Sequence, residues 1–368
     1  MKVIIDKSKL HNILSHCAGI VDRKATMPIL ANILISAGKN SLTISATDLE
    51  VTAVISESAE VEETGSTTIN AKIFNDIVRE LPDGPVKIEL ASGERIVINA
   101  GGAKLKVNGV SADEYPNLPG IGINTSKSIS SSQFLEMINK TLFAVSDDET
   151  SFNLTGVYFC NYENNLRMVA TDGHRIAIVS KEVAALNLPE GVIVPKKGLA
   201  EVRRYLSDLE SAEVGISIDD GFMVVTSNNA KFSVRLIDAD YPDYEQVVPK
   251  DHSALARVNA AELSKALRRV ALLATDKIKG VKMKFSANKL IVASSSPELG
   301  EAQEKIKVNY QGDEVEIGFN ATYIQDIISS LDAYEELLIE LSGTLGPGKF
   351  YAEQDPGYFS VVMPIRIG

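Results

Sequence analysis

The sequence predicts an α+β fold built from three repeats, each with antiparallel strands and two helices. Similar segments, NSLTISATDLEV, NNLRMVATDGHR and NKLIVASSSPEL, begin at Asn40, Asn164 and Asn288, equally spaced along the chain. Apolar residues with helical spacing occur in two stretches of every repeat. Short alternating or apolar runs between these stretches are typical of strands. Helices that cover one face of antiparallel sheets account for this mixture.

The elements follow in order from these patterns. Six helices are expected around the apolar stripes at 10–18, 74–81, 134–145, 199–209, 263–271 and 324–331. Strands are expected among the runs between them, including 41–46, 95–100, 166–171, 175–180, 222–227, 289–294 and 314–319. Prolines in ADEYPNLPG (112–120) and DADYPDYEQVVP (238–249) interrupt regular structure and indicate linkers. We therefore expect three domains, at 1–123, 124–250 and 251–368.

Composition narrows the class of protein. The chain has 368 residues, is 45% hydrophobic and carries a net charge of -12, which favours solubility and, as an average, disfavours nucleic acid. It contains neither an export signal nor an apolar run long enough to span a membrane, so a cytoplasmic location without membrane attachment is expected. Cys17 and Cys160 lie among apolar neighbours without metal-ligand spacing, which favours reduced packing residues.

The stretch VATDGHRIAIV (169–179) combines an acid, a histidine and an arginine, as an active-site loop does. However, Ala170, Thr171 and Asp172 repeat the register of Ala46, Thr47 and Asp48, which favours a tight hairpin turn over catalysis. His174 and Arg175 are better candidates for partner binding than for proton transfer. No catalytic, metal or cofactor motif is found elsewhere, so we expect a protein that is not an enzyme and has no cofactor.

Basic residues gather off the apolar stripes of several predicted helices. They include Lys7, Lys9, Arg23, Lys24, Lys72, Arg79, Lys140, Lys196, Lys197, Arg203, Arg204, Lys265, Arg268 and Arg269. In an acidic protein such faces indicate local phosphate contacts, although a solvated helix face is the alternative.

Five segments together resemble the bacterial sliding clamp, the beta subunit of DNA polymerase III. They are ATMPILANILI (25–35), VATDGHRIAIV (169–179), IVPKKGLAEV (193–202), YPDYEQVVP (241–249) and VVMPIRI (361–367), in order over the whole chain. The resemblance implies the DNA clamp fold and a head-to-tail homodimer whose ring encircles duplex DNA without sequence specificity. It also implies a processivity factor that tethers the replicative polymerase and other replication and repair proteins.

The resemblance implies roles for particular residues. DNA contact would fall to Lys24, Lys72, Arg79, Lys196, Lys197, Arg203 and Arg204. The loop SDDETSF (146–152) carries three acids where family members often present polar, aromatic or basic groups, so DNA contact is not carried over to it. Retention on DNA would be topological, so weak phosphate contacts suffice.

A groove for short peptides ending in leucine and phenylalanine is also implied, serving polymerase subunits, the clamp loader and repair proteins. Its matching residues are Leu154, Thr171, Gly173, His174, Arg175, Ile176, Pro242, Val247, Val361, Met363, Pro364 and Arg366. Apolar walls would bury the anchors, while His174, Arg175 and Arg366 would bond the peptide backbone.

At the dimer seam, a basic edge would meet an acidic edge of the other subunit, which fixes the head-to-tail direction. The residues are Lys104, Leu105, Lys106 and Val107 on one side and Leu272, Leu273, Glu298, Glu301 and Glu304 on the other. Two other hypotheses remain: a repeat-built protein-interaction scaffold that does not encircle DNA, and an enzyme that acts through the turn at 172–175.

Overall fold

A computed structural model describes residues 1–21, 27–124, 127–163, 165–183, 188, 191–210, 212–274, 279–331 and 333–367. The chain folds as two compact units. Unit 1 contains the described residues of Met1–Leu135 and Val194–Asp238. Unit 2 contains those of Glu136–Val183, Leu188–Ile193 and Ala239–Gly368.

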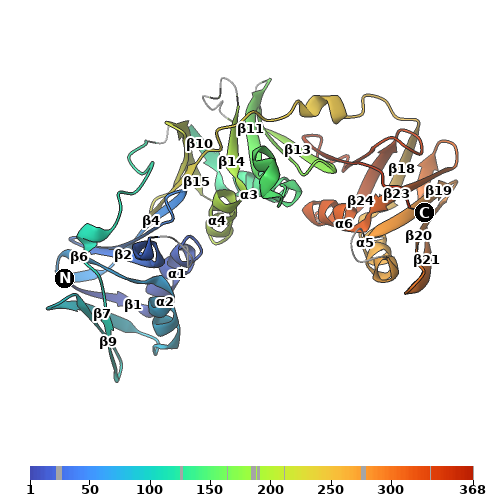
Figure 1. Cartoon of the computed structure of the whole chain (residues 1–368). Helices are drawn as coiled ribbons and strands as arrows, with labels where there is room; N and C mark the ends of the chain where they lie inside the picture. Colours follow the sequence, from blue (N-terminus) through green and yellow to red (C-terminus); the bar gives the residue numbers. More distant parts are fainter. Residues whose placement is uncertain are drawn as a thin grey trace. The chain divides into compact units, whose positions relative to one another are not determined.

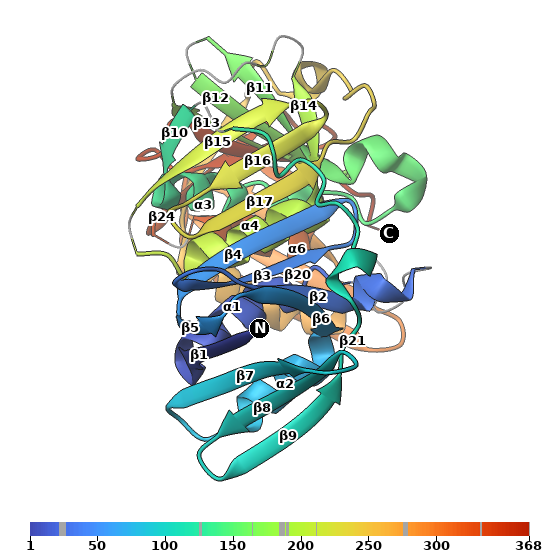
Figure 2. The same cartoon turned by 90° about the vertical axis from the view of Figure 1, so that its left-hand side faces the viewer.

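Two antiparallel sheets form unit 1. The five-stranded sheet has the order β5 (Glu60–Glu63), β1 (Lys2–Asp6), β7 (Pro85–Ala91), β8 (Arg95–Ala100) and β9 (Ala103–Asn108). The eight-stranded sheet, whose strands lie side by side in Figure 2, has the order β10 (Lys127–Ser130), β15 (Glu213–Asp219), β16 (Phe222–Thr226), β17 (Ala230–Arg235), β4 (Val51–Ser58), β3 (Ser41–Thr47), β2 (Asn32–Ala37) and β6 (Gly65–Asn70).

Three helices bury their apolar stripes against these sheets: α1 (Lys7–Ala18), α2 (Ala71–Glu80) and α4 (Lys196–Ser207). Helix α1 packs on α2, on β3 and β4, and on α4. Two starts are set by side-chain caps, because Asp6 accepts a hydrogen bond from the Ser8 amide at 2.8 Å and Asn70 from the Ile73 amide at 3.1 Å. Because the apolar stripes of these helices are buried, their polar faces are left on the surface of unit 1.

Two further sheets form unit 2, whose last strands and helices, from α5 onward, are orange to red in Figure 1. The nine-stranded sheet has the order β14 (Val192–Pro195), β11 (Gly156–Tyr162), β12 (Asn165–Thr171), β13 (Arg175–Glu182), β26 (Tyr358–Val362), β25 (Gly348–Tyr351), β24 (Glu336–Leu341), β18 (Ala254–Asn259) and β22 (Asn309–Gln311). The four-stranded sheet has the order β21 (Gly300–Ile306), β20 (Lys289–Ser296), β19 (Gly280–Ser286) and β23 (Val315–Asn320). Helices α5 (Ala260–Val270) and α6 (Ala321–Ser330) pack together beside them.

The predicted α+β class is confirmed, with a helix at each of the six predicted stripes. Sheets run across the repeat boundaries, because β4 of the first repeat pairs with β17 of the second and β13 of the second pairs with β26 of the third. The two compact units therefore do not follow the repeats, and the three-domain division stays a prediction.

One helix is shorter than its stripe suggests. Helix α3 (Ser131–Asn139) ends before Leu142 and Val145, and Leu142 begins a short 3-10 turn. The Thr141 hydroxyl donates to the Met137 carbonyl at 2.9 Å at this end, so a side chain satisfies a backbone group of the last turn.

Lys140, which follows α3, was placed on an exposed basic face by the sequence, and that prediction is wrong. The residue is only 3% exposed, and its ammonium group is hydrogen-bonded to the carboxylates of Glu136 and Asp355. Asp355 is itself 2% exposed and also pairs with Lys181 at 3.1 Å. A buried lysine needs such partners because an isolated charge is costly away from water.

Candidate functional site

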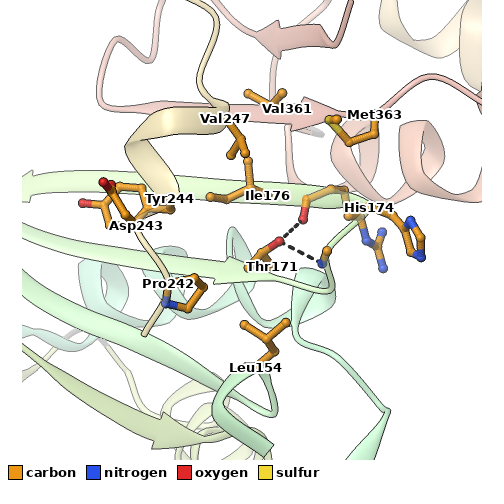
Figure 3. A pocket seen from close by; sticks show the side chains of 12 residues that line it. Leu154, Thr171, His174, Ile176, Pro242, Asp243, Tyr244, Val247, Val361 and Met363 are labelled. Carbon is orange, nitrogen blue, oxygen red and sulfur yellow. Dashed lines mark hydrogen bonds between the residues drawn. The ribbon is translucent and has the colours of Figure 1, made fainter. Parts of the chain in front are cut away.

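A groove in unit 2 opens between the β12–β13 hairpin, the segment around 242–247 and the end of β26 (Figure 3). Its volume is about 300 Å³. It is lined by Leu154, Thr171, Gly173, His174, Arg175, Ile176, Pro242, Asp243, Tyr244, Val247, Val361 and Met363. Segments far apart in the sequence are thus brought to one surface.

The hairpin at Asp172 and Gly173 forms one wall, and the turn predicted there is confirmed. Gly173 has a φ of 84°, which glycine adopts without a steric penalty. The Asp172 carboxylate accepts hydrogen bonds from the amides of His174 and Arg175, both at 3.0 Å. The Thr171 hydroxyl donates to the Arg175 carbonyl at 2.6 Å and accepts from the Gly173 amide at 3.1 Å (Figure 3). The backbone of the tip is therefore held rigidly.

Apolar side chains make the floor of the groove. Ile176 and Val361 are paired on the neighbouring strands β13 and β26 and belong to one buried cluster. Val247 and Met363, which also line the groove, are 46% and 41% exposed. A groove with buried and exposed apolar residues together suits the apolar side chains of a peptide bound in an extended conformation.

Arg175 lines the groove, but its polar atoms are used inside the protein. Its guanidinium donates to Asp172 at 3.0 Å, to Asp326 of α6 at 2.6 Å and to the Phe143 carbonyl at 2.6 Å. It also lies over the Tyr323 ring, 4.3 Å from the centroid. Arg175 therefore positions the hairpin. By contrast, the His174 side chain is exposed and has no hydrogen-bond partner among the described residues.

Ten of the twelve residues predicted for a peptide groove line this one. Pro364 and Arg366 do not, because the chain leaves the groove after Met363 and lies over β23, where the Ile365 amide donates to the Gly318 carbonyl at 2.9 Å. Sequence reasoning missed Asp243 and Tyr244, although Pro242 and Val247 in the same YPDYEQVVP segment pointed to them.

The basic residues predicted to contact DNA lie on helices of unit 1. Lys72 and Arg79 are exposed on α2, with side-chain exposures of 61% and 58%, and both pair with Asp76. Lys197 and Arg203 are exposed on α4, and Lys196 is half-buried at its first residue. Arg203 has no carboxylate partner among the described residues. Lys24 lies outside the described residues.

Lys197 and Arg204 also form contacts that stabilise unit 1. Lys197 pairs with Asp48, whose carboxylate accepts the amides of Glu50 and Val51 in the first-repeat counterpart of the Asp172 turn. Arg204 pairs with Glu201 and donates to the His16 carbonyl at 2.8 Å, at the end of α1. Gly19 leaves room for it, since a Cβ there would lie 2.5 Å from Arg204 Nη1.

Six of the nine residues predicted for a dimer seam lie on the outer strands of two different sheets, and Leu272, Leu273 and Glu298 lie in turns. Lys104, Leu105, Lys106 and Val107 belong to β9, where the lysines are exposed and the apolar pair is half-buried. Glu301 and Glu304 belong to the edge strand β21, with Glu298 in the preceding turn. Leu272 is 74% exposed, whereas Leu273 is half-buried. Leu299, which was not among the predicted seam residues, is 51% exposed. Glu304 already pairs with Arg269 at 2.9 Å.

The described residues contain no group of side chains that could hold a metal ion. Within the same residues, every helix is too short or too polar to cross a bilayer.

Three family models match in succession along the chain. The N-terminal domain of the DNA polymerase III beta subunit matches residues 1–119, its central domain 128–243 and its C-terminal domain 245–366. The chain belongs to the DNA polymerase III beta subunit family. It is accordingly a DNA sliding clamp, a processivity factor of DNA replication.

Relatives of this beta subunit match over their full length. The beta sliding clamps of Vibrio cholerae and Escherichia coli K12 are 32% and 30% identical, with all of each chain covered. Among solved structures, the sliding clamp of Bartonella birtlesii bound to griselimycin is 29% identical with a TM-score of 0.93. The Bacillus subtilis clamp is 30% identical with a TM-score of 0.92, and both comparisons cover all of each chain.

Proposed function

We propose that two copies of the chain join head to tail in a ring around duplex DNA. Polymerase subunits, the clamp loader and repair proteins then dock short peptides in the groove. The observation that carries this proposal is the convergence of ten predicted peptide-binding residues on a single groove. The chain acts without catalysis, as a tether. Each subunit comprises three clamp domains, at 1–123, 124–250 and 251–368.

Contacts to DNA come from Lys24, Lys72, Arg79, Lys196, Lys197, Arg203 and Arg204. The exposed bases on α2 and α4 support this role, because flexible cations bind phosphates without reading base sequence. Pairing of Lys72, Arg79 and Lys197 with neighbouring acids weakens each contact and so favours sliding over tight binding.

Subunits join by β9 of one copy and β21 of its partner. Both strands end their sheets, and an open strand edge offers unpaired backbone groups to another strand. Lysines alternate along β9, and Glu301 on β21 and Glu298 in the turn before it are exposed, so opposite charges meet. The exposed Leu272 supplies apolar area at the same seam.

Retention on DNA tests the ring. The protein is loaded by a bacterial clamp loader onto nicked circular DNA, which is then cut at one site, at salt that screens phosphate contacts. Retention on circles and loss from linear molecules are expected. Equal release from both would refute encirclement.

A charge reversal tests the seam independently. Lys104→Glu with Lys106→Glu should yield monomers in sedimentation, because like charges then meet. A partner carrying Glu298→Lys and Glu301→Lys should restore dimers with that variant. A dimer that persists in the first variant alone, or no restoration in the mixture, would contradict this seam.

A further inference from the structure

We infer that the groove selects partner peptides by charge, preferring a basic residue over an acidic one beside the apolar anchors. The inference rests on the proposed peptide-binding function and deepens it. The feature that carries it is the distribution of charge along the groove, with an uncompensated carboxylate on Asp243.

Arg175, the one arginine among the described residues that line the groove, brings no net positive charge. Arg175 is bonded to two carboxylates, those of Asp172 and Asp326, so the group of three carries one net negative charge. Its side chain is only 10% exposed. An acidic residue of a peptide therefore finds no free cation there.

Asp243 is exposed and lies with Tyr244 at the opposite end of the groove from His174 and Met363 (Figure 3). Its carboxylate accepts the Glu245 amide at 3.2 Å and the Gln246 side-chain amide at 2.9 Å. Both donors are neutral, so they fix the carboxylate in place but do not neutralise its negative charge. No lysine, arginine or histidine forms an ion pair with Asp243 within the part of the chain that the structure describes.

The neighbouring acid differs from Asp243 in this respect. Glu245 lies 3.5 Å from the Arg167 guanidinium, which is 12% exposed and stacks on the Tyr162 ring. Asp243 is therefore the acid of the groove lining that a partner's cation can pair with. A lysine or arginine beside the apolar anchors would meet it, whereas a glutamate would be repelled.

The size of the preference follows from the exposure of Asp243. Ion pairs at an exposed carboxylate are weak, so the preference should be about two- to five-fold in Kd. It should decrease as salt is raised, because exposed charges are screened. The apolar anchors supply the rest of the affinity.

Fluorescence anisotropy with labelled peptides tests the inference on the full-length protein. All peptides share a leucine–phenylalanine anchor pair, with Lys or Glu placed before or after it. The native protein should bind a Lys peptide about two- to five-fold more tightly than the matched Glu peptide. Asp243→Asn should remove the preference, because it removes the negative charge. The local structure should be kept, since the amide oxygen can still accept from the Glu245 amide. Asp243→Lys should reverse it.

Asp313→Asn provides the matched control, because it removes one exposed negative charge from unit 2 outside the groove lining. It should keep the preference. Equal binding of Lys and Glu peptides to the native protein would overturn the charge selection while leaving the groove intact. Equal loss of preference in the Asp313 and Asp243 variants would also overturn it, in favour of a general charge effect. If no anchor peptide bound at all, the peptide-binding function itself would fall.

Discussion

The Arg175 guanidinium donates a 2.6 Å hydrogen bond to the Asp326 carboxylate, which ties the hairpin at the groove to helix α6. The two residues are 151 positions apart in the sequence. Beside Arg175, the exposed His174 side chain has no hydrogen bond to any other described residue. Adjacent residues of the same turn therefore have different tasks, one structural and one available to a ligand.

Arg175→Ala should destabilise unit 2 by about 2 kcal/mol, since Asp326 and Asp172 would lose a largely buried charged partner. His174→Ala should change stability little, because an exposed side chain without partners is removed, but it should weaken peptide binding. Urea unfolding and anisotropy on both variants separate these effects. Equal stability of the two variants would refute a structural role for Arg175.

The buried charge cluster around Lys140 provides a second prediction. Asp355→Asn should cost about 3 kcal/mol, because Lys140 would remain buried with one carboxylate partner fewer. The double change Lys140→Met with Asp355→Leu should cost less than the single change, since no unpaired charge is left behind.

Glu314→Gln is the control for that experiment. It breaks the surface ion pair with Lys284, which spans 2.6 Å, and should leave the urea midpoint almost unchanged. A larger loss in the double variant than in Asp355→Asn would contradict the interpretation of the cluster.

Acid should weaken unit 2 through Glu136. Burial disfavours its ionised form, but hydrogen bonds from Lys140 and Lys181 outweigh burial and lower the pKa of its carboxyl. The ionised group therefore contributes stability that is fully present above the ordinary glutamate pKa of about 4.3 and is lost as pH falls through the lowered pKa.

Urea midpoints measured from pH 6 to pH 3 check this dependence. Glu136→Gln should flatten the decrease below about pH 4.3, whereas Glu316→Gln, at an exposed position of β23, should not. Identical pH profiles for the native protein and Glu136→Gln would exclude this carboxyl as the cause.

The C-terminal segment provides a fourth prediction. A Cβ at Gly318 would lie 2.5 Å from the Ile365 carbonyl oxygen, so Gly318→Ala should displace this segment from β23. Met363, whose backbone amide donates to the His174 carbonyl at 2.8 Å, should then become less ordered. Peptide binding should weaken as a result. Hydrogen exchange at Met363 and Ile365 measures the displacement. Gly102→Ala, where a Cβ meets nothing within 4 Å, should leave both properties intact.

Local pattern was sufficient for the elements and for the hairpin turn at the site. Apolar periodicity placed all six helices, and the Asp172–Gly173 turn was predicted from residues that favour such turns. Ten groove residues were predicted through resemblance to the family, which carries tertiary information that one sequence lacks. The ring, its seam and its DNA contacts stay predictions.

The sequence by itself determined the triplicate α+β plan, because repeats and apolar periods are properties of neighbouring residues. Only the tertiary structure decided what the charged residues do. Lys140 has the spacing of a surface base, yet a carboxylate 215 residues away makes its burial possible. Asp243 has the sequence context of an ordinary turn residue, yet the approach of β12, β13 and β26 makes it part of a groove. Charge pairing acts between neighbours in space, which a local pattern does not specify.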